Sequence, residues 1–398
     1  MKNVLFISSY PFPLYKGSNQ HAYFFVKALT LNFNVYCIFF IQPENADCSY
    51  DKVASFELDV KKIDICHFNT SPEKNIHLRR LKRLFAFPYH YMNLATHPRA
   101  LQTINSCIRK HSIDIVHFEH FHYVKYAFLI PYSVKKMVVY HDLHHMIAWK
   151  KIPFTNGNIN KLFLCAGCFK NYIFERLIET RIDQKIFLNP EEMSCLPKNS
   201  SHIPHVVDPA IVYNKPRINN SSCNILFLGG YNHPPNRISI KYIVDCVVPN
   251  LVQRIDEFQI YIVGQGTERY EQYLTNYPYR AFINIRGFVK DINDVFKDID
   301  IALLPVLYGG GIKTKIIEAM AAGVPVVTTP EAIIGLKDLP KGCIGLGTTA
   351  LELSRELLLL MKDYSLRFQR SKLGREYVET VHSFDEFSRK VTKLYKSI

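Results

Sequence analysis

The sequence predicts an α/β protein made of two doubly wound domains, each with a parallel sheet covered by helices on both faces. Short apolar strands alternate with longer amphipathic segments along the whole chain, which is typical of parallel sheets buried on both sides. The pattern also restarts: residues 1–8 lead into a loop and helix, and residues 223–228 do so again. A length of 398 residues suits two domains of about 200 residues each.

Each element is predicted from its apolar spacing. Uninterrupted apolar runs predict strands at residues 4–8, 35–41, 113–118, 137–140, 225–228, 259–263, 301–304 and 324–328. Apolar residues three and four positions apart predict helices at 19–31, 99–111, 159–181, 237–252 and 313–321. Residues 196–222 are rich in Pro, Asn and Ser, as expected of a linker. The tract 351–398 has a helical pattern and leaves no strand to pair, so it should pack as helices and cross back over the first domain.

Charge and composition exclude several classes of protein. With 48% apolar and 21% charged residues, the chain is neither disordered nor fibrous. Its net charge of +14 indicates an anionic partner, either nucleic acid, a phosphorylated small molecule or an acidic membrane surface. No helix-turn-helix, zinc-finger or RNP pattern occurs, so nucleic acid is not expected. The amino terminus reads as a buried strand, not a secretion signal.

Cysteine usage favours a reducing, cytoplasmic location. The ten cysteines are scattered without a compact framework. Cys165 and Cys168 form one CxxC with apolar flanks and no second pair. We therefore expect them in a packed helix interior, not in a zinc or redox site.

A glycine-rich loop is expected between the strand at 301–304 and the helix at 313–321. The three glycines at 309–311 allow close approach of a ligand to the backbone, and the start of a helix favours an anion. Lys313 and Lys315 in the first turn oppose the helix dipole unless a negative group binds there. The pattern indicates an anion-binding site, and a tight turn with solvated lysines is the alternative.

Residues 309–327 resemble the donor-binding segment of retaining GT-B glycosyltransferases of family 4, also called group 1. Other stretches fit the family in the same order, so the resemblance covers nearly the whole chain: 8–18, 140–142, 203–208, 227–230, 262–266 and 286–289. It implies the GT-B fold, two Rossmann-like domains facing across a cleft. The expected parts are an acceptor-side domain (1–205), a nucleotide-sugar-binding domain (206–380) and a C-terminal helix (381–398) that packs back on the first domain.

The resemblance also implies roles for individual residues of the donor site. Glu318 matches the glutamate that holds the ribose hydroxyls, while Gly310 stands where the family's first motif glutamate is expected. The amides of Gly311 and Ile312 would hold the diphosphate, with Lys313 as counter-charge. The other donor-binding residues implied are Gly17, Gly229, Gly230, Gly287, Phe288 and Val289. Residues 287–289 would read the base, and no cofactor is expected beside the donor, a UDP-sugar.

Histidines and acidic residues mark strand ends in the first half. His141 and Asp142 resemble the family's strand-end residues near the anomeric centre, and with Lys313 and Glu318 they form the expected catalytic set. A further pair, His117 and Glu119, matches the acceptor side. A metal site is the alternative for this His-rich region, although the family implies none.

Residues 77–87 have leucines at helical spacing surrounded by four basic residues. This pattern predicts a helix that binds an anionic membrane surface, and an ordinary surface helix is the alternative. We therefore expect a cytoplasmic protein, peripheral on the inner face of the membrane.

The resulting hypothesis is a metal-independent, retaining glycosyltransferase that acts on a surface glycan or lipid-linked acceptor. The alternatives are a catalytically silent nucleotide-binding subunit and a sugar-nucleotide epimerase of the same fold. The missing first glutamate is the feature that keeps the silent subunit open.

Overall fold

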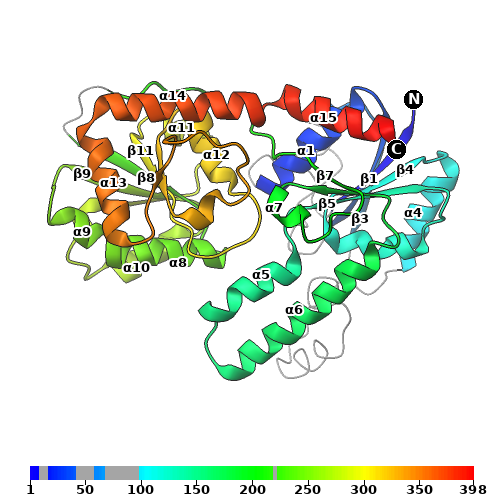
Figure 1. Cartoon of the computed structure of the whole chain (residues 1–398), viewed down its shortest axis with the longest axis horizontal. Coiled ribbons are helices and arrows are strands. Elements are labelled where there is room, and N and C mark those ends of the chain that lie inside the picture. The colour runs from blue at the N-terminus through cyan, green and yellow to red at the C-terminus, as the bar shows by residue number, and fades with distance from the viewer. Residues whose placement is uncertain (9–16, 42–57, 68–97, 218–221) are drawn as a thin grey trace. The chain divides into compact units, whose positions relative to one another are not determined.

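The computed structural model describes residues 1–8, 17–41, 58–67, 98–217 and 222–398, which form two compact units. The first unit comprises Met1–Pro204 together with Phe387–Ile398, and the second comprises His205–Glu386. Each unit contains one parallel sheet with helices packed against it (Figure 1). The basic segment 77–87 lies outside the described residues.

The first unit is built on a seven-stranded parallel sheet with strand order β3-β2-β1-β4-β5-β6-β7. Its strands are β1 (Asn3–Ser8), β2 (Asn34–Ile41), β3 (Val60–His67), β4 (Ile115–Phe118), β5 (Lys135–Tyr140), β6 (Gln184–Phe187) and β7 (Ser200–His202). All four residues of β4 are buried, and so are the last five of β1. Because these central strands are covered on both faces, their sequences are uninterrupted apolar runs.

Three strands of this sheet have no such signal in the sequence. The edge strand β3 carries Lys61, Lys62 and Asp64, and β7, at the opposite edge, is Ser-Ser-His. The third is β6, which is only four residues long. The prediction that all of residues 196–222 form a linker is therefore wrong at β7, because an edge strand half-exposed to solvent needs no apolar run.

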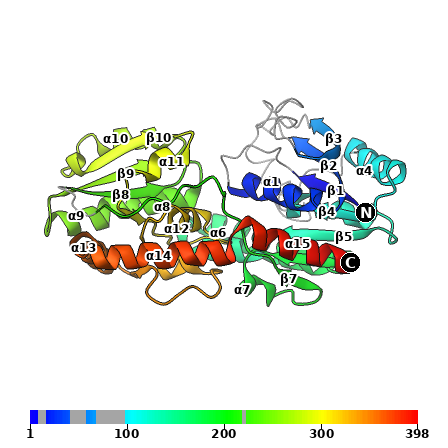
Figure 2. The ribbon, with the colours of Figure 1, turned by 90° about the horizontal axis from the view of Figure 1, so that it is seen from above.

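Helices of the first unit are α1 (Gly17–Thr30), α4 (Pro98–Lys110), α5 (His144–Lys151), α6 (Asn158–Ile178) and α7 (Pro190–Met193), with 3-10 segments η2 (Phe121–Leu129) and η3 (Ile152–Phe154). The C-terminal helix α15 (Phe384–Ser397) also packs here, beside α1 (Figure 2). Its Phe387 and Tyr395 are fully buried, and both rings contact Phe25 of α1, with centroids 5.5 and 6.0 Å away. The last residues of the chain thus complete the first core.

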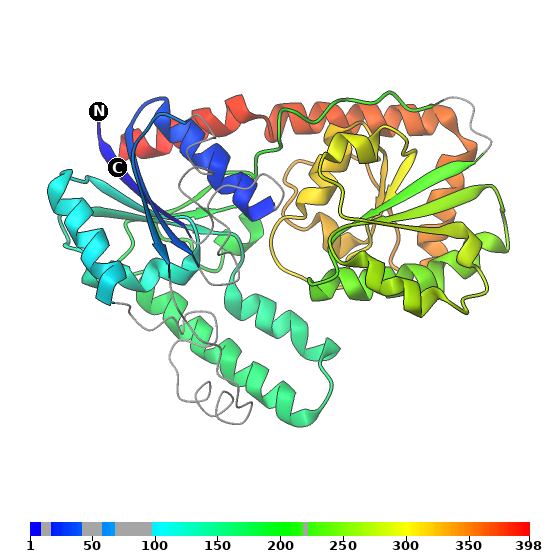
Figure 3. The same cartoon turned by 180° about the vertical axis from the view of Figure 1, so that it is seen from behind.

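The second unit contains a six-stranded parallel sheet with order β10-β9-β8-β11-β12-β13 (Figure 3). Its strands are β8 (Cys223–Leu228), β9 (Phe258–Val263), β10 (Ile283–Gly287), β11 (Ile301–Leu303), β12 (Val326–Thr328) and β13 (Gly345–Leu346). The helices are α8 (Pro234–Tyr242), α9 (Val248–Val252), α10 (Tyr270–Leu274), α11 (Ile292–Phe296), α12 (Thr314–Ala321), α13 (Ala350–Lys362) and α14 (Tyr364–Val381). This order is that of a doubly wound sheet: successive strands are added toward one edge from β8 to β10 and toward the other edge from β11 to β13.

The helix expected at 237–252 differs from the structure in two respects. It begins earlier, at Pro234, because proline fits the first turn of a helix, where its missing N–H is not needed. It is also interrupted by a π-helical turn, η4 (Ile243–Val247), before α9. Pro249 lies in the first turn of α9. Because proline has no N–H to donate within a helix, the π-helical turn ends before it and α9 begins there.

The CxxC on α6 does not lie in a packed interior as expected. Cys165 is exposed and Cys168 is half-buried. Along α6 the buried residues all lie beyond its first nine: Gly167, Asn171, Phe174, Glu175 and Ile178. The apolar flanks of the motif therefore belong to an exposed surface. Among the described residues, no helix is both long and apolar enough to span a membrane.

Candidate functional site

In the second unit, the loops that follow β8 and β11 lie where ligands bind in open α/β sheets, because these two neighbouring strands flank the switch point. After β8 the chain continues as Gly229-Gly230, and after β11 it passes through Gly309–Gly311 into α12. Gly311 has φ +60° and Gly309 has φ +153°, which are backbone conformations that favour glycine.

The loops that follow β8 and β9 contact each other directly. A Cβ on Gly264 would lie 2.5 Å from the carbonyl carbon of Gly229, and the amide of Tyr231 donates to the carbonyl of Gln265 at 2.9 Å. At the end of β10, Gly287 has φ +66°, and a Cβ there would meet the Glu268 carboxylate. Close approach of the two loops thus requires glycine at 264, and its positive φ and the nearby Glu268 require it at 287, whereas a Cβ on Gly229 would lie 2.7 Å from the side chain of Asn236.

Two lysines lie at the beginning of α12. Lys313 is its N-cap residue, and its Nζ donates to the carbonyls of Gly310 and Gly311 at 2.8 and 2.7 Å. The Nζ of Lys315 donates to Oδ1 of Asn236 at 3.0 Å and lies 4.6 Å from the centre of the Phe227 ring. Asn236, on α8, in turn donates to the carbonyl of Gly230 at 3.1 Å. Lys315 therefore connects α12 with the loop after β8.

Both Lys315 and Glu318, one turn further along α12, titrate near neutral pH. Burial, together with the positive charge of Lys313, lowers the pKa of Lys315 to about 7. Burial and the negative charge of Asp208 raise the pKa of Glu318 to about 7. Burial and the nearby Lys315 also lower the pKa of His233, the residue before α8. An arriving polyanion would stabilise the protonated lysine.

Sequence reasoning missed His233 and Asn236 in this region, although both follow the Gly229-Gly230 turn within a few residues. Phe288 is 54% exposed and Val289 is half-buried, both after β10. Gly17 begins α1, in the first unit, whereas the other expected donor residues belong to the second. The donor roles of these residues stay predictions.

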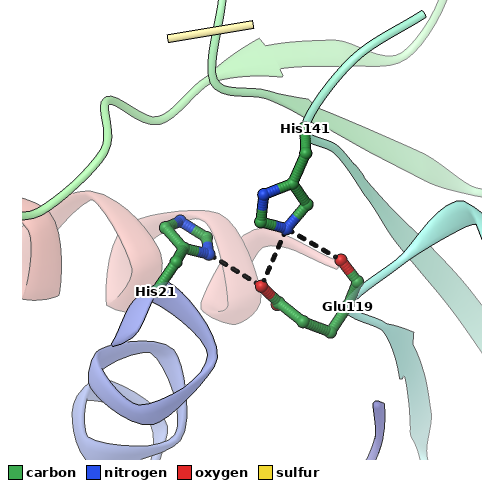
Figure 4. Close-up of side chains that lie close together, drawn as sticks. All are labelled: His21, Glu119 and His141. Atoms are coloured by element: carbon green, nitrogen blue, oxygen red, sulfur yellow. Dashed lines mark hydrogen bonds and ion pairs between the residues drawn. The ribbon is translucent and has the colours of Figure 1, made fainter. Parts of the chain in front are cut away.

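In the first unit, a single carboxylate is surrounded by three imidazoles. Figure 4 shows this carboxylate with two of them, His21 and His141. Glu119 follows β4, and its Oε1 lies 2.7 Å from Nδ1 of His21 on α1 and 3.0 Å from Nε2 of His141 after β5. Its Oε2 lies 2.9 Å from Nε2 of His117 on β4. The hydroxyl of Tyr395, on α15, contacts Nδ1 of His117. We call these five residues the Glu119 cluster.

The electrostatics of the Glu119 cluster favour an ionised carboxylate. Burial by itself would raise the pKa of Glu119, but the charge of His21 and the hydrogen bonds from His117, His141 and His21 hold it well below its usual value. Burial lowers the pKa of His21 and of His117 despite the carboxylate. Because an ionised carboxylate only accepts hydrogen bonds, each ring must carry a hydrogen on the nitrogen facing Glu119.

The residues of the Glu119 cluster differ in whether solvent or a ligand can reach them. The side chains of His117 and Glu119 have no exposed surface, whereas that of His141 is 19% exposed. His141 also contacts the backbone carbonyl of Glu119 at 3.1 Å, and its ring stacks on that of His120. Glu119 therefore holds the ring of His141 in one orientation and one tautomer. The expected acceptor-side role of His117 and Glu119 stays a prediction. Both side chains are buried, and Glu119 hydrogen-bonds His141, which is partly exposed.

His21 and Tyr395 were missed by sequence reasoning. His21 lies within the apolar run of α1, and Tyr395 lies 374 positions further along the chain, near the C-terminus. Asp142, expected beside His141, is half-buried.

One group among the described residues offers three atoms to a metal ion, namely His21, Glu119 and His141, whose ligand atoms all lie within 4.8 Å of one another. The same atoms already satisfy one another at hydrogen-bond distances of 2.7 and 3.0 Å. The donor set would suit zinc or another ion that prefers imidazole. The expectation that the protein works without a metal stays a prediction.

Both the sequence and the fold of this chain are similar to those of known proteins. Residues 222–358 match the family model of the glycosyl transferases group 1. No curated protein matches the chain. Sucrose-phosphate synthase from Thermosynechococcus elongatus has a similar structure, with a TM-score of 0.72 and 14% identity over 100% of this chain and 99% of that one.

Two further solved structures are similar over their whole length. HepE from Anabaena, in complex with UDP-glucose, has a TM-score of 0.69 and 12% identity, with 100% of both chains covered. WaaG, a glycosyltransferase involved in lipopolysaccharide biosynthesis, has a TM-score of 0.63 and 13% identity over 98% of this chain and 99% of that one. At such identities the likeness concerns the fold. The whole chain therefore has the GT-B fold, and its residues 222–358 are similar to the glycosyl transferases group 1.

Proposed function

We propose that the protein is a retaining glycosyltransferase that transfers a sugar from a nucleoside diphosphate sugar to a glycan acceptor. The observation that carries this proposal is the pair Lys313 and Lys315 at the start of α12, next to glycine loops at the switch point of a sheet of the group 1 family. Two cations at a helix N-terminus are unfavourable by themselves. They suit a diphosphate, which carries concentrated negative charge as it leaves the sugar.

Each expected site residue has a part in this reaction. The backbone of 310–312 with Lys313 and Lys315 binds the diphosphate, and Glu318 accepts hydrogen bonds from the ribose. Residues 287–289 read the base, and Gly17, Gly229 and Gly230 allow the donor to approach the backbone. His141 and Asp142 contact the donor sugar, with Glu119 orienting His141. The departing phosphate takes the acceptor's proton on the same face, which gives retention.

The proposed donor is a UDP-sugar, in line with the UDP-glucose complex of HepE. The proposed acceptor is a surface polysaccharide or a lipid-linked oligosaccharide, in line with the role of WaaG in lipopolysaccharide biosynthesis. The protein would act in the cytoplasm, peripheral on the inner face of the membrane, with contact through the basic segment 77–87.

A catalytically silent nucleotide-binding subunit is the second candidate, since Gly310 replaces the first motif glutamate. Binding and turnover separate the two. UDP-, GDP- and CMP-sugars are screened by thermal shift, and release of the nucleoside diphosphate is then followed with the protein alone. Slow hydrolysis of one donor supports the enzyme, while stabilisation without any hydrolysis or transfer supports the silent subunit. No response to any nucleotide sugar would contradict both.

Turnover should survive removal of metal ions. Since lysines and backbone amides supply the positive charge, EDTA is expected to leave the rate of donor hydrolysis unchanged. The rate is compared before and after dialysis against EDTA, with magnesium, manganese or zinc added back. Loss that returns with one of these ions would contradict the prediction and would make His21, Glu119 and His141 metal ligands.

Donor affinity should pass through a maximum near pH 7. As pH rises through the pKa of Lys315, about 7, the amine loses the charge that attracts the diphosphate. As pH falls through the pKa of Glu318, also about 7, the carboxylate is protonated and accepts hydrogen bonds from the ribose less well. The measurement is the Kd of an intact nucleotide sugar by calorimetry, because its diphosphate diester does not titrate in this range.

A variant of Lys315 tests whether this lysine causes the loss of donor affinity above pH 7. Lys315→Met is expected to bind more weakly and to lose the decline of affinity above pH 7, whereas Lys337→Met, at an exposed position, should keep the wild-type profile. If the affinity of Lys315→Met still declined above pH 7 as in the parent, Lys315 would not be the group that causes the decline.

A further inference from the structure

The helical hairpin formed by α5, η3 and α6 extends away from the sheet of the first unit (Figures 1 and 3). No residue of α5 or η3 is buried, and the first nine residues of α6 are also unburied. Because a helix rises 1.5 Å per residue, this unburied part of α6 is about 13 Å long. The hairpin is anchored at its base, where the carboxylate of Glu175 accepts hydrogen bonds from the amide of His144 at 2.9 Å and from the ring of His145.

The hairpin exposes large apolar side chains. Leu162 is 70% exposed, Ile159 68%, and both Trp149 and Phe169 65%. Along α6, the exposed residues Ile159, Leu162 and Phe169 recur at intervals of three and seven, on the side opposite the buried residues. A helix that packs only against its own protein shows the reverse pattern, so this face is built for another apolar surface.

The exposed apolar surface continues into a groove between the two helices. The groove has a volume of about 560 Å³, and its lining is almost entirely apolar. Met146 and Trp149 from α5, Cys165, Cys168 and Phe169 from α6, and Cys195 contribute to it. This position explains why the CxxC has apolar flanks without lying in a core.

Beyond its base at Glu175, the charges of the hairpin have one sign. Between residues 143 and 174 the sequence contains Lys150, Lys151, Lys161 and Lys170 and no aspartate or glutamate. On α6, Lys161 and Lys170 are half-buried and lie at the two edges of the exposed apolar stripe. Their aliphatic stems can cover apolar surface while the amines reach outward. An apolar stripe flanked by lysines is the pattern of a helix that lies in the interface of an anionic membrane.

We propose that the α5–α6 hairpin docks the protein on an anionic lipid bilayer, with Trp149, Leu162 and Phe169 in the interfacial layer and the lysines at the level of the lipid phosphates. A second copy of this chain is a less suitable partner for this surface. Two such hairpins in contact would bring the four lysines of each close together, and like charges repel. The proposal does not depend on the proposed reaction, since docking needs no donor. It adds a membrane contact on described residues to the one proposed for the basic segment 77–87, which lies outside them.

Trp149 is the chain's single tryptophan, so its fluorescence reports on the hairpin directly. The full-length protein is mixed with vesicles of phosphatidylcholine, alone or with phosphatidylglycerol. We expect sedimentation with the anionic vesicles, a blue shift of the Trp149 emission, and quenching by lipids brominated in their acyl chains. Vesicle binding with no change in Trp149 emission would overturn the proposal, because another surface would then make the contact.

Variants test the two parts of the surface separately. Trp149→Ser/Leu162→Ser/Phe169→Ser should lower the affinity for anionic vesicles by at least about tenfold. Lys150→Ser/Lys151→Ser/Lys161→Ser/Lys170→Ser should remove the preference for anionic lipid. All these residues are unburied, so both variants should unfold at the parent temperature. The matched control, Leu31→Ser/Val212→Ser/Leu359→Ser, removes exposed apolar side chains elsewhere and should bind as the parent does.

Two further results would overturn the proposal. One is parent-like vesicle binding by the apolar triple variant, above all if Arg79→Ser/Arg80→Ser/Lys82→Ser/Arg83→Ser abolishes binding instead. The other is a parent protein that ignores vesicles but sediments as a dimer, with the apolar triple variant monomeric, since the surface would then join two copies of the chain.

Discussion

Replacing Glu318 by alanine is expected to weaken binding of the nucleotide sugar by roughly 5- to 150-fold. Leaving ribose hydroxyls buried without their acceptor costs about 1–3 kcal/mol, and each factor of ten in Kd corresponds to about 1.4 kcal/mol. Alanine is the best helix former, and the substitution leaves in place the backbone carbonyl of residue 318, which accepts from the amide of Ala322. The fold of α12 should therefore survive. Calorimetric titration with the nucleotide sugar measures the effect.

Two companion variants make the Glu318 test specific. Glu318→Gln keeps an acceptor oxygen but cannot ionise, so it should lose less affinity and should abolish the decline of binding below pH 7. Glu376→Ala, an exposed glutamate in the middle of helix α14, should bind the donor as the parent does. A folded Glu318→Ala protein with parental affinity would remove Glu318 from the donor site.

The largest effect on stability is expected for Glu119→Gln. This carboxylate accepts hydrogen bonds from three imidazoles, and its side chain has no exposed surface. A glutamine amide group would turn N–H toward at least one ring N–H and would leave buried donors facing each other. Removing one member of a buried charged network costs about 3–5 kcal/mol. Denaturant unfolding should therefore show a first unit destabilised by about that amount, and donor hydrolysis should fall because His141 loses its orientation.

Separating positioning from folding requires two further measurements on Glu119→Gln. Binding of the nucleotide to the second unit should stay close to the parent value, while the rate of turnover falls even at temperatures where the variant is folded. Glu191→Gln, an exposed glutamate of the same unit, is the matched control and should change neither property. Parental stability together with parental turnover would contradict the role assigned to the Glu119 cluster.

The central strands of both sheets could be predicted because their signal is local. Strands such as β1, β4 and β8 are covered on both faces, so the apolar run in the sequence is itself the structural requirement. Edge strands such as β3, β7 and β13 are polar or very short. They exist because a neighbouring strand offers hydrogen-bond partners, and that neighbour is distant in sequence.

The contacts of the candidate site also divide into those between residues close in sequence and those between residues far apart in sequence. The glycine loop, Lys313 and Glu318 lie within ten residues of one another, so motif spacing alone predicts them as a unit. The hydrogen bond between Lys315 and Asn236 joins residues 79 positions apart, and no periodicity connects them. His21 and Tyr395 reach the Glu119 cluster from opposite ends of the chain.

By itself the sequence determined the fold class and the restart of the α/β pattern near residue 223, and it predicted an anion site at the start of α12. These features follow from short-range apolar spacing, glycine conformation and helix-end charge. Only the tertiary structure decided that His117 and Glu119 are buried, that α15 completes the first core, and that one side of α6 stays exposed. Burial depends on which elements pack together, and an apolar stripe reads identically in a sequence whether it faces a core or another surface.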